Sequence, residues 1–380
     1  MKIHKHLYIY SLILVIAFAC REPFYPEIDR YENILVIDGL ITDQEGPYTV
    51  KLTRSFAFDE SFPAAEERAV VMIMDEDDGI YEFIEEQAGI YKSNLSFTGK
   101  IGTSYKLFVS TKDQESYESE WVTLSKVPEI DSITYEKQER PTSDPNQSVY
   151  GMEIKVNTHD DTNQTRYYRW EWVETWEIIT PITSSFYPDE ARCWRTAGSG
   201  VVSIGTSEHL TNDVIEDYPL YFVSTETNKL GIKYSTLVKQ YSLSREAYSY
   251  WKSLQDITQN TGTLFDPTPA MVTGNISNTS NIENPVLGIF QASALKQERI
   301  FIDRAEIPKS LDIPSGYSSC SFYDTTDSVE IDYYTNHGFP LAEIYILAEA
   351  EHYIFSNSEM CFRCTLSGSK EKPEYWPEEK

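Results

Sequence analysis

The stretch from Tyr167 to Trp176 reads Tyr-Tyr-Arg-Trp-Glu-Trp-Val-Glu-Thr-Trp and indicates the fold class of the chain. Successive side chains of a strand point to opposite faces, so the large rings of this stretch gather on one face. They are Tyr168, Trp170, Trp172 and Trp176. Alternating aromatic residues are typical of a sheet core, and the alternative is a platform on which a sugar or peptide ligand stacks. The stretch predicts a strand, with these four rings as candidate ligand-binding residues.

Shorter strand-like runs precede this stretch at regular intervals, at 34–37, 48–52, 69–74, 81–84 and 105–109. Turn signals separate them, namely Asp38-Gly39, Gly46-Pro47, Asp78-Gly79 and 99–102. The spacing, with no helical period between the runs, predicts an N-terminal β-sandwich of immunoglobulin or transthyretin type over residues 31–130. Tyr is abundant, with 27 residues, and this also favours β structure.

Residues 131–380 predict a larger β-rich domain, so the whole chain is expected to be mainly β. The polar segment 137–149 carries two prolines and predicts a surface loop or domain boundary. Further strands are expected at 152–156, 286–290, 299–302 and 342–347. The acidic run 75–79 predicts a hairpin turn, since its glycine stands one place too early for an EF-hand calcium loop. The run 159–163 predicts a second turn, with a calcium site as the alternative.

One prominent helix is expected near residues 244–259. Ser244 is a favourable N-cap, and Leu243 and Tyr248 are placed as a hydrophobic staple around it. The apolar residues that follow recur at helical spacing, at Ala247, Tyr250, Trp251, Leu254 and Ile257. The stripe predicts a helix that lies across a sheet and covers its apolar face.

The N-terminus has the three parts of a signal peptide over residues 1–19. Lys2 and Lys5 precede an apolar run at 7–18, which is shorter than the ~20 residues that span a bilayer as a helix. Ala19 then stands before Cys20, and cleavage at such a cysteine is the bacterial lipoprotein pattern, which predicts acylation of Cys20 and anchoring to a lipid bilayer. A plain signal peptide cleaved after Ala19 is the alternative. Residues 20–30 are polar, include prolines and predict a tether.

The charge balance narrows the classes of partner. The chain has 60 Asp and Glu against 32 Lys and Arg, a formal net charge of −28. Such a surface repels nucleic acid and anionic lipid headgroups, so we expect no nucleic-acid partner. The charge serves the solubility of an exported protein or, alternatively, attracts cationic ligands or divalent ions.

The remaining four cysteines predict two disulfides, because an even number in an exported chain is expected to pair. They are Cys193, Cys320, Cys361 and Cys364, and three pairings are open. A metal knuckle at Cys361 and Cys364 is the alternative. The histidines are scattered, and no nucleophile elbow or phosphate loop is present, so we expect no metal site, no cofactor and no enzymatic activity.

Several segments together resemble a family of Bacteroidota outer-membrane lipoproteins known as the domain of unknown function 4249 family. The matching segments are 35–43, 234–243, 262–267 with 274–276, and 361–364 with 372–376. The resemblance implies an outer-membrane lipoprotein encoded alongside a TonB-dependent transporter, with no catalytic residue to carry over. The expected function is that of a non-enzymatic accessory or binding subunit that captures a nutrient for the transporter or caps it. A structural or adhesive envelope protein that binds another macromolecule is the alternative.

Overall fold

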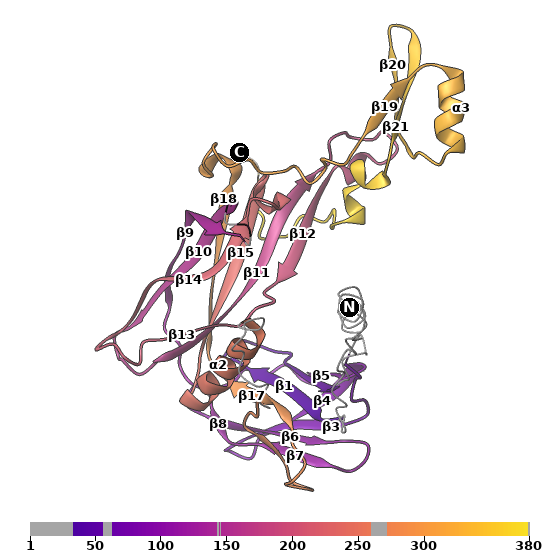
Figure 1. Cartoon of the computed structure of the whole chain (residues 1–380). Helices are drawn as coiled ribbons and strands as arrows, with labels where there is room; N and C mark the ends of the chain where they lie inside the picture. Colours follow the sequence, from indigo (N-terminus) through magenta and orange to yellow (C-terminus); the bar gives the residue numbers. More distant parts are fainter. Residues whose placement is uncertain (1–32, 56–62, 143, 145, 260–271, 379–380) are drawn as a thin grey trace, which may run out of the picture.

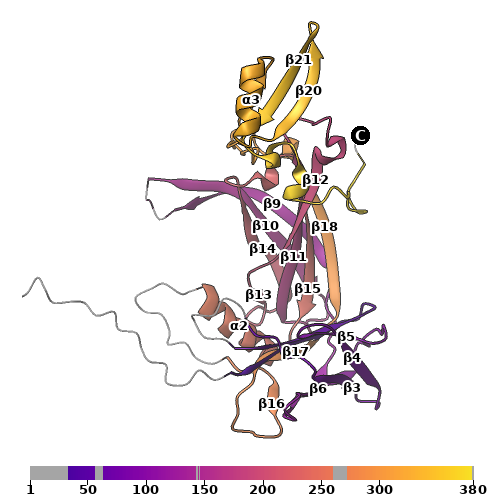
Figure 2. The same cartoon turned by 90° about the vertical axis from the view of Figure 1, so that its right-hand side faces the viewer.

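The computed structural model describes residues 33–55, 63–142, 144, 146–259 and 272–378, and it is mainly β, as predicted. The described chain forms three regions in a row along one long axis (Figure 1). An N-terminal sheet lies at one end, two sheets form the middle, and a small sheet with one helix lies at the other end. Figure 2 shows the same succession from the side.

The N-terminal region is one continuous ten-stranded sheet with the order β16-β7-β6-β3-β4-β5-β2-β1-β17, with β8 paired to β6. Its strands are β1 (Leu35–Ile41), β2 (Thr49–Arg54), β3 (Val70–Asp75), β4 (Ile80–Gln87), β5 (Ile90–Ser93), β6 (Ser104–Ser110), β7 (Ser116–Ser119), β8 (Val122–Thr123), β16 (Ile276–Asn278) and β17 (Leu287–Ala292). Residues alternate between buried and exposed along most of these strands, as one-sided burial requires. Their inward residues form one core, which includes Ile37, Leu52, Ile73 and Phe290.

The sheet curls until its two edge strands meet. The side-chain amide of Asn275, just before β16, donates to the Phe290 carbonyl (2.8 Å), and its oxygen accepts from the Phe290 N–H (2.9 Å). Gly288 on β17 has φ +100°, and a Cβ there would lie 1.8 Å from the Ile37 carbonyl oxygen, so only glycine fits. The closed curl protects edges that would otherwise be free to pair with another chain.

Two turn signals in this region had different outcomes. The acidic run 75–79 is a hairpin turn, as predicted: the Asp75 carboxylate accepts the N–H groups of Asp77 (3.0 Å) and Gly79 (2.7 Å) between β3 and β4. The turn predicted at Asp38-Gly39 was wrong, because both residues lie inside β1. A Cβ on Gly39 would stand 3.2 Å from the Phe290 ring, so this glycine allows close packing and makes no turn.

The middle region packs a three-stranded sheet against a five-stranded one. The first has the order β14-β10-β9, with β9 (Ile130–Pro141), β10 (Ser148–Asp160) and β14 (Asp213–Ser224). The second has the order β12-β11-β15-β18 with β13 paired to β11, and contains β11 (Tyr167–Ile179), β12 (Arg192–Gly198), β13 (Ser203–Thr206), β15 (Lys233–Ser242) and β18 (Leu295–Asp303). The strand predicted at 167–176 is β11, at the centre of this second sheet. Short 3-10 helices are η1 (Pro188–Glu190), η2 (Asn228–Leu230), η3 (Arg304–Glu306), η4 (Glu359–Cys361) and η5 (Cys364–Leu366).

The surface loop or boundary predicted over 137–149 was wrong for most of its length. It is the outer half of a long β9–β10 hairpin, and only residues 142–147 lie between the strands. Ion pairs cross the hairpin from Lys155 to Glu136 and from Arg140 to Glu153 (2.9 Å). Both faces of this outer half of the hairpin lie near solvent, so polar residues occupy both faces. The alternation of apolar and polar residues that indicates a strand is therefore missing from this segment.

The chain returns to the N-terminal sheet late in the sequence. The expected division at 130/131 falls at the start of β9, but β16 and β17 lie beyond it and complete the first sheet. β17 runs parallel to β1. The chain therefore crosses between the two regions several times, near Ser125, Ser242 and Ser293. These crossings contact one another: the Ser242 N–H donates to the Ser293 hydroxyl (2.9 Å), and the Ser242 hydroxyl donates to the Ser125 carbonyl (3.2 Å).

The prominent helix is α2 (Arg245–Gln259), as predicted for 244–259. The Ser244 hydroxyl accepts the N–H of Ala247 (3.1 Å) as the N-cap. Leu243 packs in one cluster with Tyr248 and Trp251 over the rings and side chains of β11 and β13. The helix thus covers the apolar face of the second sheet at its end nearest the N-terminal region (Figure 1).

The C-terminal region is the smallest. Its sheet has the order β19-β21-β20, with β19 (Phe322–Thr325), β20 (Leu341–Leu347) and β21 (Ala350–Ser356). A helix that the sequence analysis did not anticipate, α3 (Ser328–Asn336), begins after Asp327, whose carboxylate accepts the N–H of Val329 (2.7 Å). It lies against this sheet (Figure 1).

Candidate functional site

The four aromatic residues proposed for ligand binding lie in the core of the middle region. Tyr168 and Trp170 are 0 % exposed, Trp172 is 4 % exposed and Trp176 is 5 % exposed. They fill the space between the two sheets, where Trp170 stacks on Tyr218 and Trp172 stacks on Tyr221. No ring offers a face to a ligand from solvent, so the ligand-binding assignment is corrected to a core role.

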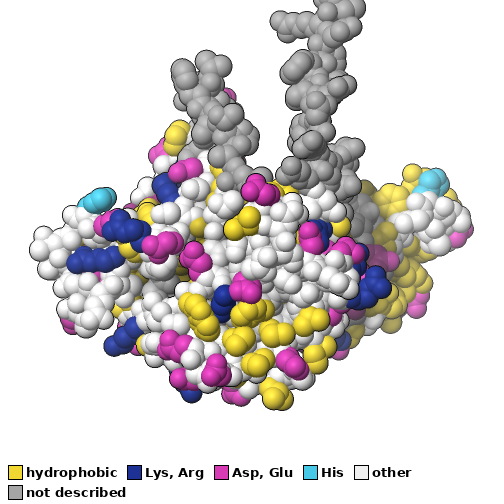
Figure 3. All heavy atoms as spheres, turned by 90° about the horizontal axis from the view of Figure 1, so that it is seen from below, with side chains coloured by type: hydrophobic (Ala, Val, Ile, Leu, Met, Phe, Trp, Pro, Cys, Tyr) yellow, Lys and Arg dark blue, Asp and Glu magenta, His cyan; other side chains and the backbone are white. Residues whose placement is uncertain are grey.

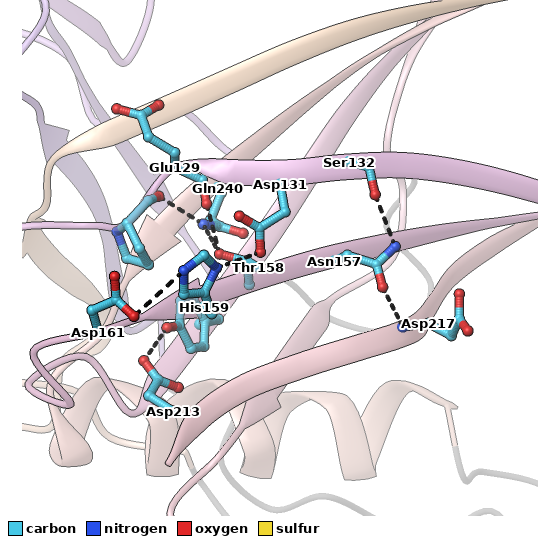
Figure 4. A network of polar contacts seen from close by, with 12 residues as sticks. Glu129, Asp131, Ser132, Asn157, Thr158, His159, Asp161, Asp213, Asp217 and Gln240 are labelled. Atoms are coloured by element: carbon cyan, nitrogen blue, oxygen red, sulfur yellow. Dashed lines mark hydrogen bonds and ion pairs between the residues drawn. The ribbon is translucent and has the colours of Figure 1, made fainter.

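A buried polar network crosses this core. Gln240, 0 % exposed, accepts the indole N–H of Trp170 (2.8 Å) and donates to the Pro128 carbonyl and the Thr158 hydroxyl (both 3.0 Å). Figure 4 shows Gln240 and Thr158 side by side between the strands. Because Pro128 belongs to the segment between the first two regions, the network also fixes where the middle region starts.

An exposed histidine lies beside this network. Nδ1 of His159 on β10 is 2.7 Å from the carboxylate of Asp131 on β9, and its Nε2 faces Asp161 at 3.7 Å (Figure 4). The hydrogen bond and negative charge of Asp131 raise the pKa of His159. Both ring nitrogens face carboxylates, an arrangement that serves an ion pair on the surface and does not activate a nucleophile.

The run 159–163 leads into a turn between strands, as predicted: β10 ends at Asp160, and the turn itself is at Asp161 and Thr162. Burial alone would raise the pKa of Asp160, but hydrogen bonds from the Thr162 hydroxyl and the N–H groups of Thr165, Thr162 and Gln164 lower it to about 2. These bonds occupy the carboxylate that a calcium ion would need. In the described part of the chain, no group of three or more His, Cys, Asp or Glu side chains could hold a metal ion.

A cleft of about 990 Å³ lies between α2 and the seam of the N-terminal sheet, which is the place where its edge strands β16 and β17 meet. This volume is at the upper end of the range typical of small-molecule sites. One face of α2 lines it, at Glu246, Ser249, Tyr250, Ser253 and Ile257. Glu246, Tyr250, Ser253 and Ile257 follow one another at steps of three or four, with Ser249 beside Tyr250, so they share one side of the helix. Tyr248 and Trp251 lie on another side and pack on β11 and β13.

The opposite wall comes from the N-terminal region. Trp121, between β7 and β8, is 50 % exposed and lines the cleft. Gln291 and Ile289 of β17 form part of the floor, and the Gln291 side chain accepts the indole N–H of Trp251 (2.7 Å). The cleft therefore combines an accessible ring, apolar side chains and many hydroxyl groups, a composition suited to holding a small organic ligand.

The charge at the cleft is negative. Glu120, Glu246 and Asp256 line it, and Asp256 pairs with Lys252 (2.9 Å). The one cation among the described lining residues, Arg245, pairs with Glu208 outside the cleft. Loss of water contact, and secondly the charge of Asp38, raise the pKa of Tyr250 to about 12, so its phenol stays protonated and can donate a hydrogen bond. Neutral or cationic ligands fit this setting better than anions.

The cysteines form two disulfides, as predicted, and the structure selects the pairing. Cys193 bonds to Cys364 and Cys320 bonds to Cys361. The first joins β12 to η5 inside the core of the middle region, and the second lies in the cluster of the C-terminal region. With all four sulfurs paired, the metal knuckle alternative fails. The proposed lipidation site, Cys20, lies outside the described residues.

Fold and cleft together define a β-rich architecture in which a helix borders a cleft between two regions. The chain belongs to the family described as Domain of unknown function (DUF4249), whose model matches residues 21–299. The match covers the N-terminal sheet, every strand that builds the cleft, and the middle region as far as the first half of β18. A search of curated proteins found no match. Among the described residues, no helix is both long and apolar enough to cross a membrane.

Sequence reasoning missed the cleft for a clear reason. Trp121 stands in Ser-Glu-Trp-Val without a neighbouring ring and outside any periodic run, so it carries no local signal. Tyr250 and Ile257 were assigned to one apolar stripe with Trp251, yet the helix uses them on a different side. Only the tertiary fold brings Trp121 and Tyr250 to the same cavity.

Proposed function

We propose that this chain is an outer-membrane lipoprotein that acts as a non-enzymatic binding subunit for a TonB-dependent transporter. The observation that supports it most is the cleft between α2 and the N-terminal sheet, with the half-exposed ring of Trp121 in a concave site. An exposed ring in a cavity favours capture of a small ligand, whereas a flat and uniformly acidic surface would favour an adhesive role.

The chemistry of the lining favours binding over catalysis. Among the described residues that line the cleft there is no histidine, cysteine or lysine, so the usual base and nucleophile pairs are not assembled there. Its hydroxyl groups include Ser249 and Ser253 on α2, each of which donates to a backbone carbonyl one turn earlier. Their oxygen lone pairs can still accept hydrogen bonds from a ligand.

The membrane location rests on the sequence. A signal peptide over residues 1–19, followed by Cys20 as the acylation site, supports the acyl anchor, and the family resemblance supports the transporter as partner. The acidic surface keeps the exported domain soluble above the bilayer. The ligand class that fits the cleft is a neutral or cationic small molecule with one planar or apolar face.

Native mass spectrometry of the protein purified from its own membranes tests the capture role. We expect a bound small molecule of constant mass that Trp121→Ala and Ser253→Trp both reduce at least tenfold. Leu95→Ala, at a position 77 % exposed and absent from the cleft lining, is the matched control and should retain the ligand. An unliganded wild-type protein, or equal occupancy in all variants, would refute ligand capture in the cleft.

A further inference from the structure

The outer face of the N-terminal sheet carries an apolar surface that its own chain does not cover. Three adjacent strands, β4, β3 and β6, direct one set of side chains into the core and the other set outward. The outward apolar side chains are Val70, Met72, Met74, Ile80, Ile84 and Phe108. We call them the β3–β4–β6 face. Figure 3, which looks at this end of the molecule, shows hydrophobic side chains gathered there.

The strand register makes the face continuous. Met74 lies opposite Ile80 on β4, and Met72 lies opposite Phe108 on β6. Val70, Ile80 and Ile84 are 58 %, 59 % and 56 % exposed. Contiguous apolar surface of this kind is uncommon on a soluble domain and marks interaction sites.

The outward charges on the strands of this face and their neighbours are balanced, and the acidic turn 75–79 lies at one end of the face. The outward ionisable side chains on these strands and their neighbours are Lys51, Lys92, Lys106, Glu82, Glu86 and Glu118. Lys106 pairs with Glu118, and Lys92 pairs with Glu86. These strands thus carry three basic and three acidic outward side chains, whereas acidic residues outnumber basic ones by 60 to 32 in the whole chain.

This combination favours a protein as the occupant. A bilayer surface selects exposed Trp, Tyr and a cationic excess, and this face offers neither. Methionine side chains adapt to irregular protein surfaces, and two lie here. A second copy of the chain is disfavoured, because each copy carries a net charge of −28.

The start of the described chain limits how far this face can lie from an anchor on Cys20. The Asn33 carbonyl accepts a hydrogen bond from Arg54 (3.2 Å), and Arg54 pairs with Glu66 (2.7 Å), four residues before Val70. Twelve residues lie between Cys20 and Asn33, and these thirteen Cα–Cα steps span at most about 45 Å. An acyl anchor on Cys20 therefore keeps the N-terminal region within reach of proteins embedded in the same membrane.

We infer that the β3–β4–β6 face docks on the extramembrane part of a protein embedded in the same membrane, through apolar and uncharged side chains of that partner. The inference rests on the proposed function for the lipid anchor and for the transporter as partner. It adds the surface through which the two proteins meet, and it leaves the cleft on the seam free for ligand.

Site-specific photo-crosslinking in native membranes tests the docking surface. A benzophenone amino acid replaces Ile84 in the full-length, C-terminally tagged chain, and the control replaces Ile346, which is 74 % exposed on the C-terminal hairpin. We expect an adduct between the Ile84 probe and a membrane-embedded β-barrel protein, identified by mass spectrometry, and none from the Ile346 probe. The double variant V70E/I84E should lower recovery of that barrel at least tenfold, while I346E should leave it within twofold. Unchanged thermal melting shows that the variants fold.

The outcomes separate the two proposals. If the wild-type chain recovers the barrel and V70E/I84E recovers it equally, the docking face is wrong and the proposed function stands. If the wild-type chain recovers no barrel, the proposed function fails first. An adduct only with a second copy, an adduct only with lipid, or no adduct at all from the Ile84 probe would overturn the docking inference.

Discussion

The two disulfides should contribute unequally to stability, and the difference can be worked out from the chain. Cys193 and Cys364 are 171 residues apart, and Cys320 and Cys361 are 41 apart. In the chain-entropy view, a crosslink stabilises a protein by restricting the unfolded chain, and longer loops gain more. At 25 °C this gives about 5 kcal/mol for the longer loop and about 4 kcal/mol for the shorter one.

Burial increases the expected difference between the stabilities that the two disulfides contribute. Cys193 and Cys364 are both 0 % exposed and pack in the core of the middle region, whereas Cys320 is only half-buried in the small C-terminal cluster. Removal of the first disulfide therefore loosens the main core, and removal of the second loosens mainly the C-terminal region.

Urea unfolding of C193A/C364A and C320A/C361A, followed by tryptophan fluorescence, checks this reasoning. Trp194, next to Cys193, and Trp176 report on the middle region. We expect C193A/C364A to lower the unfolding midpoint of that signal strongly and C320A/C361A to shift it little. Equal shifts, or a larger shift in C320A/C361A, would refute the assignment of the first disulfide to the main core. Peptide mapping without reductant is the control for the pairing.

Three further outcomes are expected. Gln240→Leu leaves the Trp170 indole N–H without its buried partner and should lower the free energy of unfolding by about 3 kcal/mol, measured by urea titration; an effect below experimental error contradicts the network. Asp160→Ala should lower the free energy of unfolding by about 2 kcal/mol at neutral pH, since the pKa of Asp160 in the folded protein lies nearly two units below its usual value. The difference in unfolding free energy between this variant and the wild type should disappear as pH falls from 4 toward 2. The raised pKa of His159 beside Asp131 means that this pair stabilises the fold below about pH 6.5 and ceases to do so as pH rises through the folded pKa. His159→Gln should therefore melt lower than wild type at pH 5.5 and equally at pH 9, and the reverse order would contradict the ion pair.

Local pattern sufficed for some elements and failed for others. The strand at 167–176 and the helix at 244–259 could be predicted because alternation and capping residues are encoded within a few neighbours. Asp38-Gly39 was misassigned because the same dipeptide serves a hairpin turn or, as here, close packing on Phe290, and only the tertiary fold distinguishes them.

Long-range features had no local signal. The parallel pairing of β1 with β17 joins residues about 250 positions apart in sequence. The periodicity within either segment does not indicate which strand it pairs with. The cleft depends on that return, since β17 supplies its floor and Trp121 its opposite wall. The four cysteines predicted two disulfides, but the pairing needed the fold to bring Cys193 to Cys364.

The most direct test of the account is recovery of the C-terminally tagged chain from membranes solubilised in mild detergent, with its companions identified by mass spectrometry. An acylated protein that co-purifies with a TonB-dependent β-barrel transporter is the expected result, and Cys20→Ala should release the chain from the membrane fraction. A tagged wild-type chain that is found alone in the soluble fraction, with residues 1–19 still attached, would contradict it.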